Sequence, residues 1–176
     1  GVRSSYSSPG SAVWVSGFGG EYGQQKRYQQ SRSAATASDP LYDPAIVTTD
    51  LSGCAAGDNR DGVPVENALD GSKSPIDASC NYTGLMNGTS SATPTVSGVT
   101  ALMLGVNPQL TWRDVKYILA TTARQIDSGQ PKALYNGSVI EPGWITNAAG
   151  HRFSNWYGFG LVDAAAAVEA ATHFTT

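Results

Sequence analysis

The stretch that most constrains the fold runs from Asn87 to Pro94 and continues into an apolar segment, Thr95 to Val106. The apolar residues of that segment recur around most of the circumference of a helix, which predicts a buried helix rather than a surface one. Gly88 and the three hydroxyl residues that follow it, Thr89, Ser90 and Ser91, precede this segment. Because glycine adopts backbone angles closed to other residues, we expect a turn here that leads into the helix.

Ser90 falls in the predicted first turn of this helix, where the backbone N–H groups have no partner inside the helix. Those donors and the positive helix end would stabilise an oxyanion formed beside Ser90, so the pattern suits a nucleophilic serine. We expect Pro94 in the first turn as well, because a proline there removes an N–H that would be unpaired anyway. Taken alone, Gly-Thr-Ser is explained more simply as a turn and helix cap.

The composition excludes several classes of function. The chain has 176 residues, the size of one globular domain, with 40% hydrophobic and 14% charged residues and a net charge of -3. This weak charge favours neither nucleic acid nor an anionic membrane, and no apolar run approaches the roughly 20 residues that span a bilayer. The first residues lack the basic and apolar regions of a signal peptide, and the missing initiator Met is consistent with a processed or truncated chain.

The two cysteines, Cys54 and Cys80, are separated by a polar stretch with several turn residues. One internal disulfide is the favoured interpretation; it would imply an oxidising compartment and stabilise the fold by about 3 kcal/mol on the chain-entropy model. Two buried thiols, or bonds to partners outside the chain, are the alternatives.

Two polar insertions, about 21–43 and 53–79, are predicted to be surface loops. The carboxylates of the second insertion have the chemistry of calcium ligands, but the spacing from Asp58 to Gly62 does not match an EF-hand, so a solvated acidic loop is expected. Short strands are predicted at 11–16 and 45–49 from their β-branched and aromatic residues.

Further along the chain, Thr111 and Asp114 resemble a capping box, and the apolar spacing predicts an amphipathic helix over 111–123 with Trp112 in the core. Asn-Gly between apolar residues predicts a hairpin over 134–140, and the Ala-rich stretch predicts a helix over 161–171. Strands with buried helices between them favour an α/β layered fold with a mostly parallel sheet. Only two of the predicted core strands are convincing, and two strands would leave much of a buried helix uncovered. The chain is therefore expected to be part of a domain.

The motif from Gly88 to Pro94 resembles the nucleophile motif of the subtilisin-like serine proteases, nearest to the kexin and furin branch with its bacterial secreted members. It is not the Gly-x-Ser-x-Gly elbow, because Ala92 stands where the second glycine would be. Three further segments resemble that branch and occur in the same order: Ile46 to Leu51, Leu110 to Val115, and Ser154 to Ala164.

The resemblance implies that residues 1–176 are the C-terminal segment of a subtilisin-like catalytic domain. It implies a serine endopeptidase with Ser90 as nucleophile, and Asn87, Gly88 and Thr89 lining the substrate and oxyanion region. The family's histidine lies within His-Gly-Thr, and neither His151 nor His173 precedes Gly-Thr. The triad His and Asp and the oxyanion Asn are therefore expected outside this chain, and the chain by itself is expected to be inactive.

The resemblance also bears on ligands, specificity and location. No cofactor is needed for the chemistry; structural calcium is expected in the family, without an identified ligand set here. Ser8 stands where the convertases have a calcium-binding glutamate and Gly10 where they have a cysteine, which weakens the case for that calcium site and for strict dibasic specificity. A preference for basic P1 residues and a secreted or periplasmic location are implied.

The expected partners are a polypeptide substrate, the remainder of the catalytic domain, and a propeptide, a chaperone or a following β-rich domain. Neither nucleic acid nor a membrane is expected. A subtilase-like binding or assembly module without catalysis is the alternative function. A secreted Gly-rich structural domain would also account for a disulfide, but it leaves the Ser90 motif unexplained.

Overall fold

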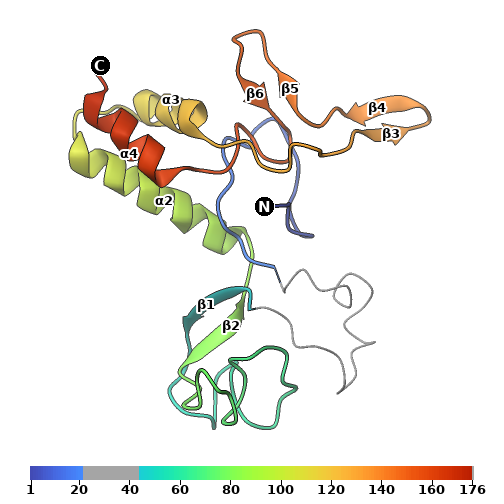
Figure 1. Ribbon diagram of the computed structural model, residues 1–176, viewed down its shortest axis with the longest axis vertical. Coiled ribbons are helices and arrows are strands. Elements are labelled where there is room, and N and C mark those ends of the chain that lie inside the picture. Colours follow the sequence, from blue (N-terminus) through green and yellow to red (C-terminus); the bar gives the residue numbers. More distant parts are fainter. Residues whose placement is uncertain (22–43, 176) are drawn as a thin grey trace. The chain divides into compact units, whose positions relative to one another are not determined.

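The computed structural model describes residues 1–21 and 44–175 (Figure 1). The described residues form two compact units: one comprises residues 1–18 and 92–175, and the other comprises 19–21 and 44–91. Apart from its first residue, the predicted insertion loop 21–43 lies outside the described residues.

The first unit is built on three helices, α2 (Thr89–Val106), α3 (Trp112–Thr122) and α4 (Ala164–His173) (Figure 1). Their buried side chains form one core together with the loop residues Leu110 and Val162. The helical members of this core are Val99, Met103, Ile118, Leu119, Ala167 and Ala171. Small alanines on α4 allow its backbone to approach the larger side chains of this core.

Two expectations about these helices were wrong. Only Val99 and Met103 of α2 are buried, whereas Leu102 and Val106 are 57% and 46% exposed, because the other described elements cover one side of α2. Trp112 is 63% exposed rather than part of the core. It is the first residue of α3, and its ring lies under the guanidinium of Arg113, 4.4 Å from the ring centroid.

The helix ends follow from local capping chemistry. The predicted capping box of α3 is confirmed: Thr111 and Asp114 each bond the other's backbone N–H. Helix α4 begins three residues later than predicted, because the Asp163 side chain caps it by accepting from the Ala166 N–H at 3.0 Å.

Two short hairpins join α3 and α4. Strands β3 (Ala133–Tyr135) and β4 (Ser138–Glu141) pair antiparallel around Asn136 and Gly137, whose positive φ values of 48° and 78° confirm the predicted Asn-Gly turn. Strands β5 (Ile145–Thr146) and β6 (Arg152–Phe153) form the second antiparallel pair.

The strand predicted at 11–16 is wrong. This segment is a turn followed by extended chain, with one parallel bridge from Ser16 to Leu161. Its Trp14 instead packs edge-on against Phe159, at 4.9 Å between ring centroids, and donates its indole N–H to the Lys116 carbonyl. Aromatic packing and three backbone hydrogen bonds to residues 159–162, rather than a regular strand, fix the segment.

The second unit contains β1 (Ile46–Thr49) and β2 (Tyr82–Met86), an antiparallel pair with an irregular register near Ile46. The loop between them is closed by the disulfide Cys54–Cys80, which confirms the pairing expected from the sequence. The strand predicted at 45–49 is confirmed as β1. The named strands among the described residues all pair antiparallel, so the parallel sheet of the expected fold class is not formed by these pairs.

The loop from 53 to 79 has no helix or regular strand, as predicted, but it is not a simple solvated acidic loop. Asp70 and Asp77 are buried, together with Asn59, Asn67 and Ser74. Asp77 accepts from the Tyr82 N–H at 2.8 Å, and the Asn59 amide donates to the carbonyls of Leu69 and Tyr82. These groups satisfy backbone polar atoms that have no ladder partner.

Candidate active site

The Ser90 motif forms a tight turn between β2 and α2. Strand β2 ends at Met86, and α2 begins at Thr89. Gly88 between them has φ 124°, a conformation that residues with a Cβ rarely adopt. The glycine expected to turn the chain before the serine is therefore required by the backbone itself.

Hydrogen bonds fix the two polar groups of Gly88. Its N–H donates to the Gly19 carbonyl at 2.8 Å, and its carbonyl accepts the Ser91 N–H at 3.1 Å. The Ser91 hydroxyl lies 3.0 Å from the Gly19 carbonyl oxygen and 2.8 Å from that of Gly88. The turn is thereby attached to Gly19, which lies far from it in the sequence.

Ser90 is exposed on the first turn of α2, beside the exposed Thr89, while Asn87 and Gly88 are half-buried. Within residues 1–21 and 44–175 no hydrogen bond engages the Ser90 hydroxyl. Its backbone N–H belongs to the first turn of α2, whose donors have no helical acceptor. The geometry thus combines an accessible hydroxyl with a backbone donor at a positive helix end.

Pro94 does not lie in the first turn as predicted, because α2 already begins at Thr89. Its missing N–H would have bonded the Ser90 carbonyl, which therefore lacks its helical partner four residues on. The turn that carries Ser90 is held by the Gly19 contacts instead of by a complete helical ladder.

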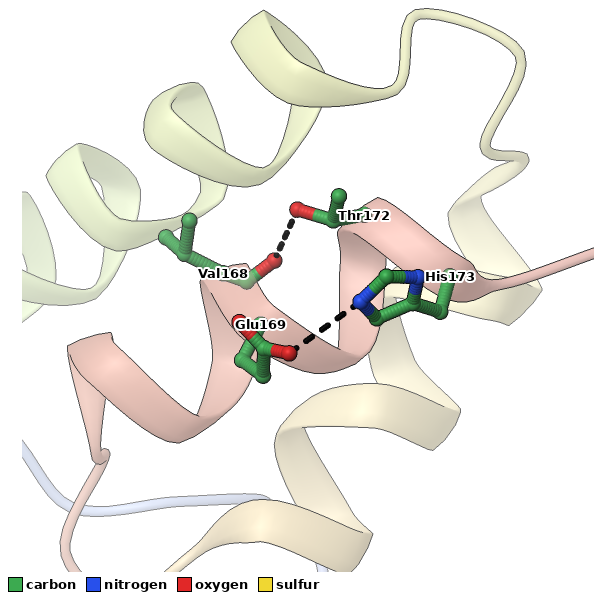
Figure 2. A network of polar contacts seen from close by, with 4 residues as sticks. All are labelled: Val168, Glu169, Thr172 and His173. Carbon is green, nitrogen blue, oxygen red and sulfur yellow. Dashed lines mark hydrogen bonds and ion pairs between the residues drawn. The ribbon is translucent and has the colours of Figure 1, made fainter.

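The two histidines of the chain have other partners. His173 points along the exposed face of α4 to Glu169, with 3.1 Å between Nε2 and Oε1 (Figure 2). His151 contacts Phe159 edge-on, with ring centroids 6.2 Å apart. These contacts give each histidine a local structural role.

The Asp50 carboxylate, in the same unit as Ser90, also has structural partners. Asp50 accepts from the Asn59 N–H at 2.6 Å, and this hydrogen bond holds the pKa of its carboxyl below the ordinary value of 3.8.

Residues 1–21 and 44–175 contain no group of three His, Cys, Asp or Glu side chains placed to hold a metal ion. Within the same ranges, no helix is both long and apolar enough to cross a bilayer.

Sequence reasoning identified the turn and its serine but missed the residues that support them. Gly19 and Ser91 contribute the carbonyl and the hydroxyl that fix Gly88. A third hydroxyl residue directly after Ser90 was the available signal. Its acceptor, a glycine 72 residues earlier, has no local signature.

The sequence model of the subtilase family matches residues 6–160, which include the Ser90 turn and most of both units. The chain belongs to the subtilase family. This match and the solved structures below confirm the α/β subtilisin-like fold class.

Two named relatives extend the comparison of this subtilase chain. The extracellular serine protease of Aeromonas sobria is 43% identical over 98% of this chain, which covers 26% of that protein. Human proprotein convertase subtilisin/kexin type 5 is 34% identical over 89% of this chain, which covers 7% of it. The resemblance to the kexin and furin branch is thereby confirmed. The chain spans about a quarter of the length of its Aeromonas relative.

Solved structures show the same relationship. The crystal structure of the Aeromonas sobria serine protease with its chaperone ORF2 matches 99% of this subtilase chain, with a TM-score of 0.77 and 42% identity. A second structure of that protease matches with a TM-score of 0.78 and 41% identity. The chain covers 28% of each solved chain.

Proposed function

We propose that this chain provides the nucleophilic serine of a subtilisin-like serine endopeptidase. The observation that carries the proposal is the exposed Ser90 on the first turn of α2, directly after a glycine with φ 124°, within the region matched by the subtilase family. Serine proteases among the relatives support the reaction class. We propose further that residues 1–176 form the C-terminal segment of the catalytic domain.

In this mechanism Ser90 Oγ attacks the carbonyl carbon of the scissile peptide bond, and its proton passes to a histidine supplied by the remainder of the domain. The Ser90 N–H stabilises the oxyanion of the tetrahedral intermediate. Collapse of this intermediate expels the leaving amine, which takes the proton from the histidine, and leaves an acyl-enzyme that water hydrolyses. Asn87, Gly88 and Thr89 shape the oxyanion region, and a side-chain donor from outside the chain completes it.

The proposal that triad residues lie outside this chain rests on two features. His151 and His173 have local structural partners. Helix α2 exposes the apolar side chains of Leu102, Leu104 and Val106, which a further layer of the catalytic domain would bury. By the same reasoning the isolated chain lacks a base for Ser90 and is inactive.

The finer expectations remain proposals. The disulfide and the extracellular Aeromonas relative support secretion. The complex of the Aeromonas protease with chaperone ORF2 supports a maturation partner of that kind for this protein. A basic P1 preference is supported by identity to a convertase, whereas Ser8 argues against a convertase-type calcium site and against strict dibasic specificity. Structural calcium stays a prediction without assigned ligands.

Labelling with a fluorophosphonate tests the function directly, because this probe reacts with an activated serine hydroxyl. The intact protein should label at Ser90, the variant Ser90→Ala should not label, and the isolated 176-residue chain should label poorly. A matched control is Ser97→Ala, which removes an exposed hydroxyl from the same helix. An intact, folded protein that does not label at Ser90 would favour the non-catalytic binding module.

A further inference from the structure

The residue after the proposed nucleophile has a hydroxyl that turns inward. Successive residues on a helix point about 100° apart, so Ser91 is directed differently from the exposed Ser90. Ser91 is half-buried, and its Oγ lies within hydrogen-bond distance of two carbonyl oxygens, those of Gly19 and Gly88. All of these residues belong to the same compact unit.

We infer that Ser91 is a positioning residue that orients the oxyanion-binding backbone at Ser90. This inference rests on the proposed function of Ser90. Ser91 touches neither substrate nor nucleophile in this assignment; it acts through the Gly88–Thr89 peptide, which is followed by the peptide that carries the Ser90 N–H. Its hydroxyl proton is shared between the Gly19 and Gly88 carbonyls.

The need for such a support follows from Gly88. A glycine with φ 124° is held by few steric limits, so its peptide planes rotate more freely than those of other residues. Hydrogen bonds must then supply the restraint. The Gly88 N–H is fixed by Gly19, and the Gly88 carbonyl is fixed by the N–H and the hydroxyl of Ser91.

The restraint reaches the oxyanion donor through planar geometry. Because a trans peptide is planar, a Gly88 carbonyl held toward Ser91 makes the Thr89 N–H point the opposite way. Thr89 is the first residue of α2, so its backbone angles are helical. The orientation of the Gly88–Thr89 peptide therefore sets the orientation of the next peptide, which carries the Ser90 N–H. Removing the Ser91 hydroxyl takes one donor away from the Gly88 carbonyl and leaves the Ser91 N–H as a donor to it.

The test compares Ser91→Ala with wild type in the intact protease, using a peptide substrate that the wild type cleaves. Active sites are first counted by fluorophosphonate labelling, so rates refer to folded enzyme. Complete loss of one oxyanion donor costs about 10²–10³ in kcat, so a displaced donor should lower kcat per labelled site about tenfold. KM should stay within about twofold, because ground-state binding does not use this donor.

A peptide aldehyde with the substrate sequence gives a second measurement, because its adduct with the serine places an oxygen in the oxyanion site. Its affinity for Ser91→Ala should fall about as much as kcat/KM. Ser91→Thr, which keeps the hydroxyl, should recover most of the activity. Ser97→Ala is the matched control, since its hydroxyl bonds the Thr93 carbonyl at 3.1 Å within α2 and should leave kcat unchanged.

Several results would overturn the inference: wild-type kcat per labelled site in Ser91→Ala, a rise in KM with kcat unchanged, or failure of folded Ser91→Thr to recover activity. If Ser91→Ala does not fold, Ser91→Cys keeps the size with a weaker donor and should show an intermediate loss; wild-type kcat in that variant would also overturn it. A wild type that never labels at Ser90 refutes the proposed function instead, so the two failures are distinguishable.

Discussion

At the scale of single residues, Tyr157 shows how one buried hydroxyl joins distant segments. Its side chain is 2% exposed, and its hydroxyl donates to Asp127 Oδ2 at 2.8 Å and accepts the Arg3 N–H at 2.9 Å. Its ring stacks on Trp144, with centroids 5.8 Å apart. Burial, followed by the hydrogen bond to Asp127, raises the pKa of Tyr157 to about 12.

This raised pKa predicts a loss of stability at alkaline pH. The unfolded tyrosine ionises near 10, whereas the folded one keeps its proton to about 12, so its contribution is complete below pH 10 and is lost as the pH rises from 10 to 12. Tyr157→Phe should weaken this pH dependence and cost about 1 kcal/mol at pH 7 through the lost hydrogen bonds. Urea unfolding at several pH values measures both effects.

Tyr135→Phe is the matched control, because Tyr135 is 68% exposed on the β3–β4 hairpin. It should leave the alkaline loss of stability unchanged. An equally steep loss between pH 10 and 12 in Tyr157→Phe and wild type would show that other groups cause it.

At the scale of secondary-structure elements, the ends of the helices depend on a few side chains. The carboxylate of Asp114 accepts from the Thr111 N–H at 2.7 Å and from its hydroxyl at 2.6 Å. These two hydrogen bonds hold the pKa of Asp114 below the ordinary value of 3.8. The start of α3 is therefore coupled to the charge of one carboxylate.

Asp114→Ala should lower the melting temperature at neutral pH, because it removes half of the capping box. A depressed carboxylate pKa stabilises the fold above the unfolded value of 3.8, and this contribution is lost as the pH falls through the lower folded value. The difference between wild type and variant should therefore shrink below pH 3.8. Asp58→Ala, an exposed carboxylate outside any helix, is the control. A difference that stays constant with pH would contradict the assignment.

At the scale of the whole molecule, the exposed apolar face of α2 is the feature that most needs an explanation. Leu102, Leu104 and Val106 are between 39% and 57% exposed. A Cβ added to Gly98, on the same helix, would meet no atom within 4 Å. If the remainder of the domain covers α2, as proposed, this space is filled in the intact protein.

Gly98→Ala tests that cover, because the sign of its effect differs between the two cases. On an uncovered helix the change should stabilise the protein by up to about 1 kcal/mol, since alanine is the better helix former. Beneath a packed layer the added methyl group should destabilise it by about 1–3 kcal/mol. We expect destabilisation in the intact protein, measured by thermal unfolding, and a higher melting temperature would argue against the cover. Gly129→Ala, at an open loop position, is the control.

Features that depend on neighbouring residues could be predicted from the amino-acid sequence. The capping box of α3, the Asn-Gly turn of the hairpin and the positive φ of Gly88 are local, because they depend on residue types that lie close together in the chain. The hydrogen bonds that hold Gly88 and Ser91 to Gly19 are not local. The disulfide was favoured because a polar stretch with turn residues separates the two cysteines, although two buried thiols or bonds to partners outside the chain stayed open. The nucleophilic role of Ser90 remains a prediction.

Features whose partners are distant in the sequence could be seen only in the folded chain. The Ser91 hydroxyl meets the carbonyl of Gly19, 72 residues earlier, and Tyr157 meets Asp127, 30 residues earlier. The exposure of Trp112 and the burial of Asp70 were likewise set by which elements pack nearby. Local propensity describes one backbone segment, whereas burial and long-range hydrogen bonds depend on how the chain folds back on itself.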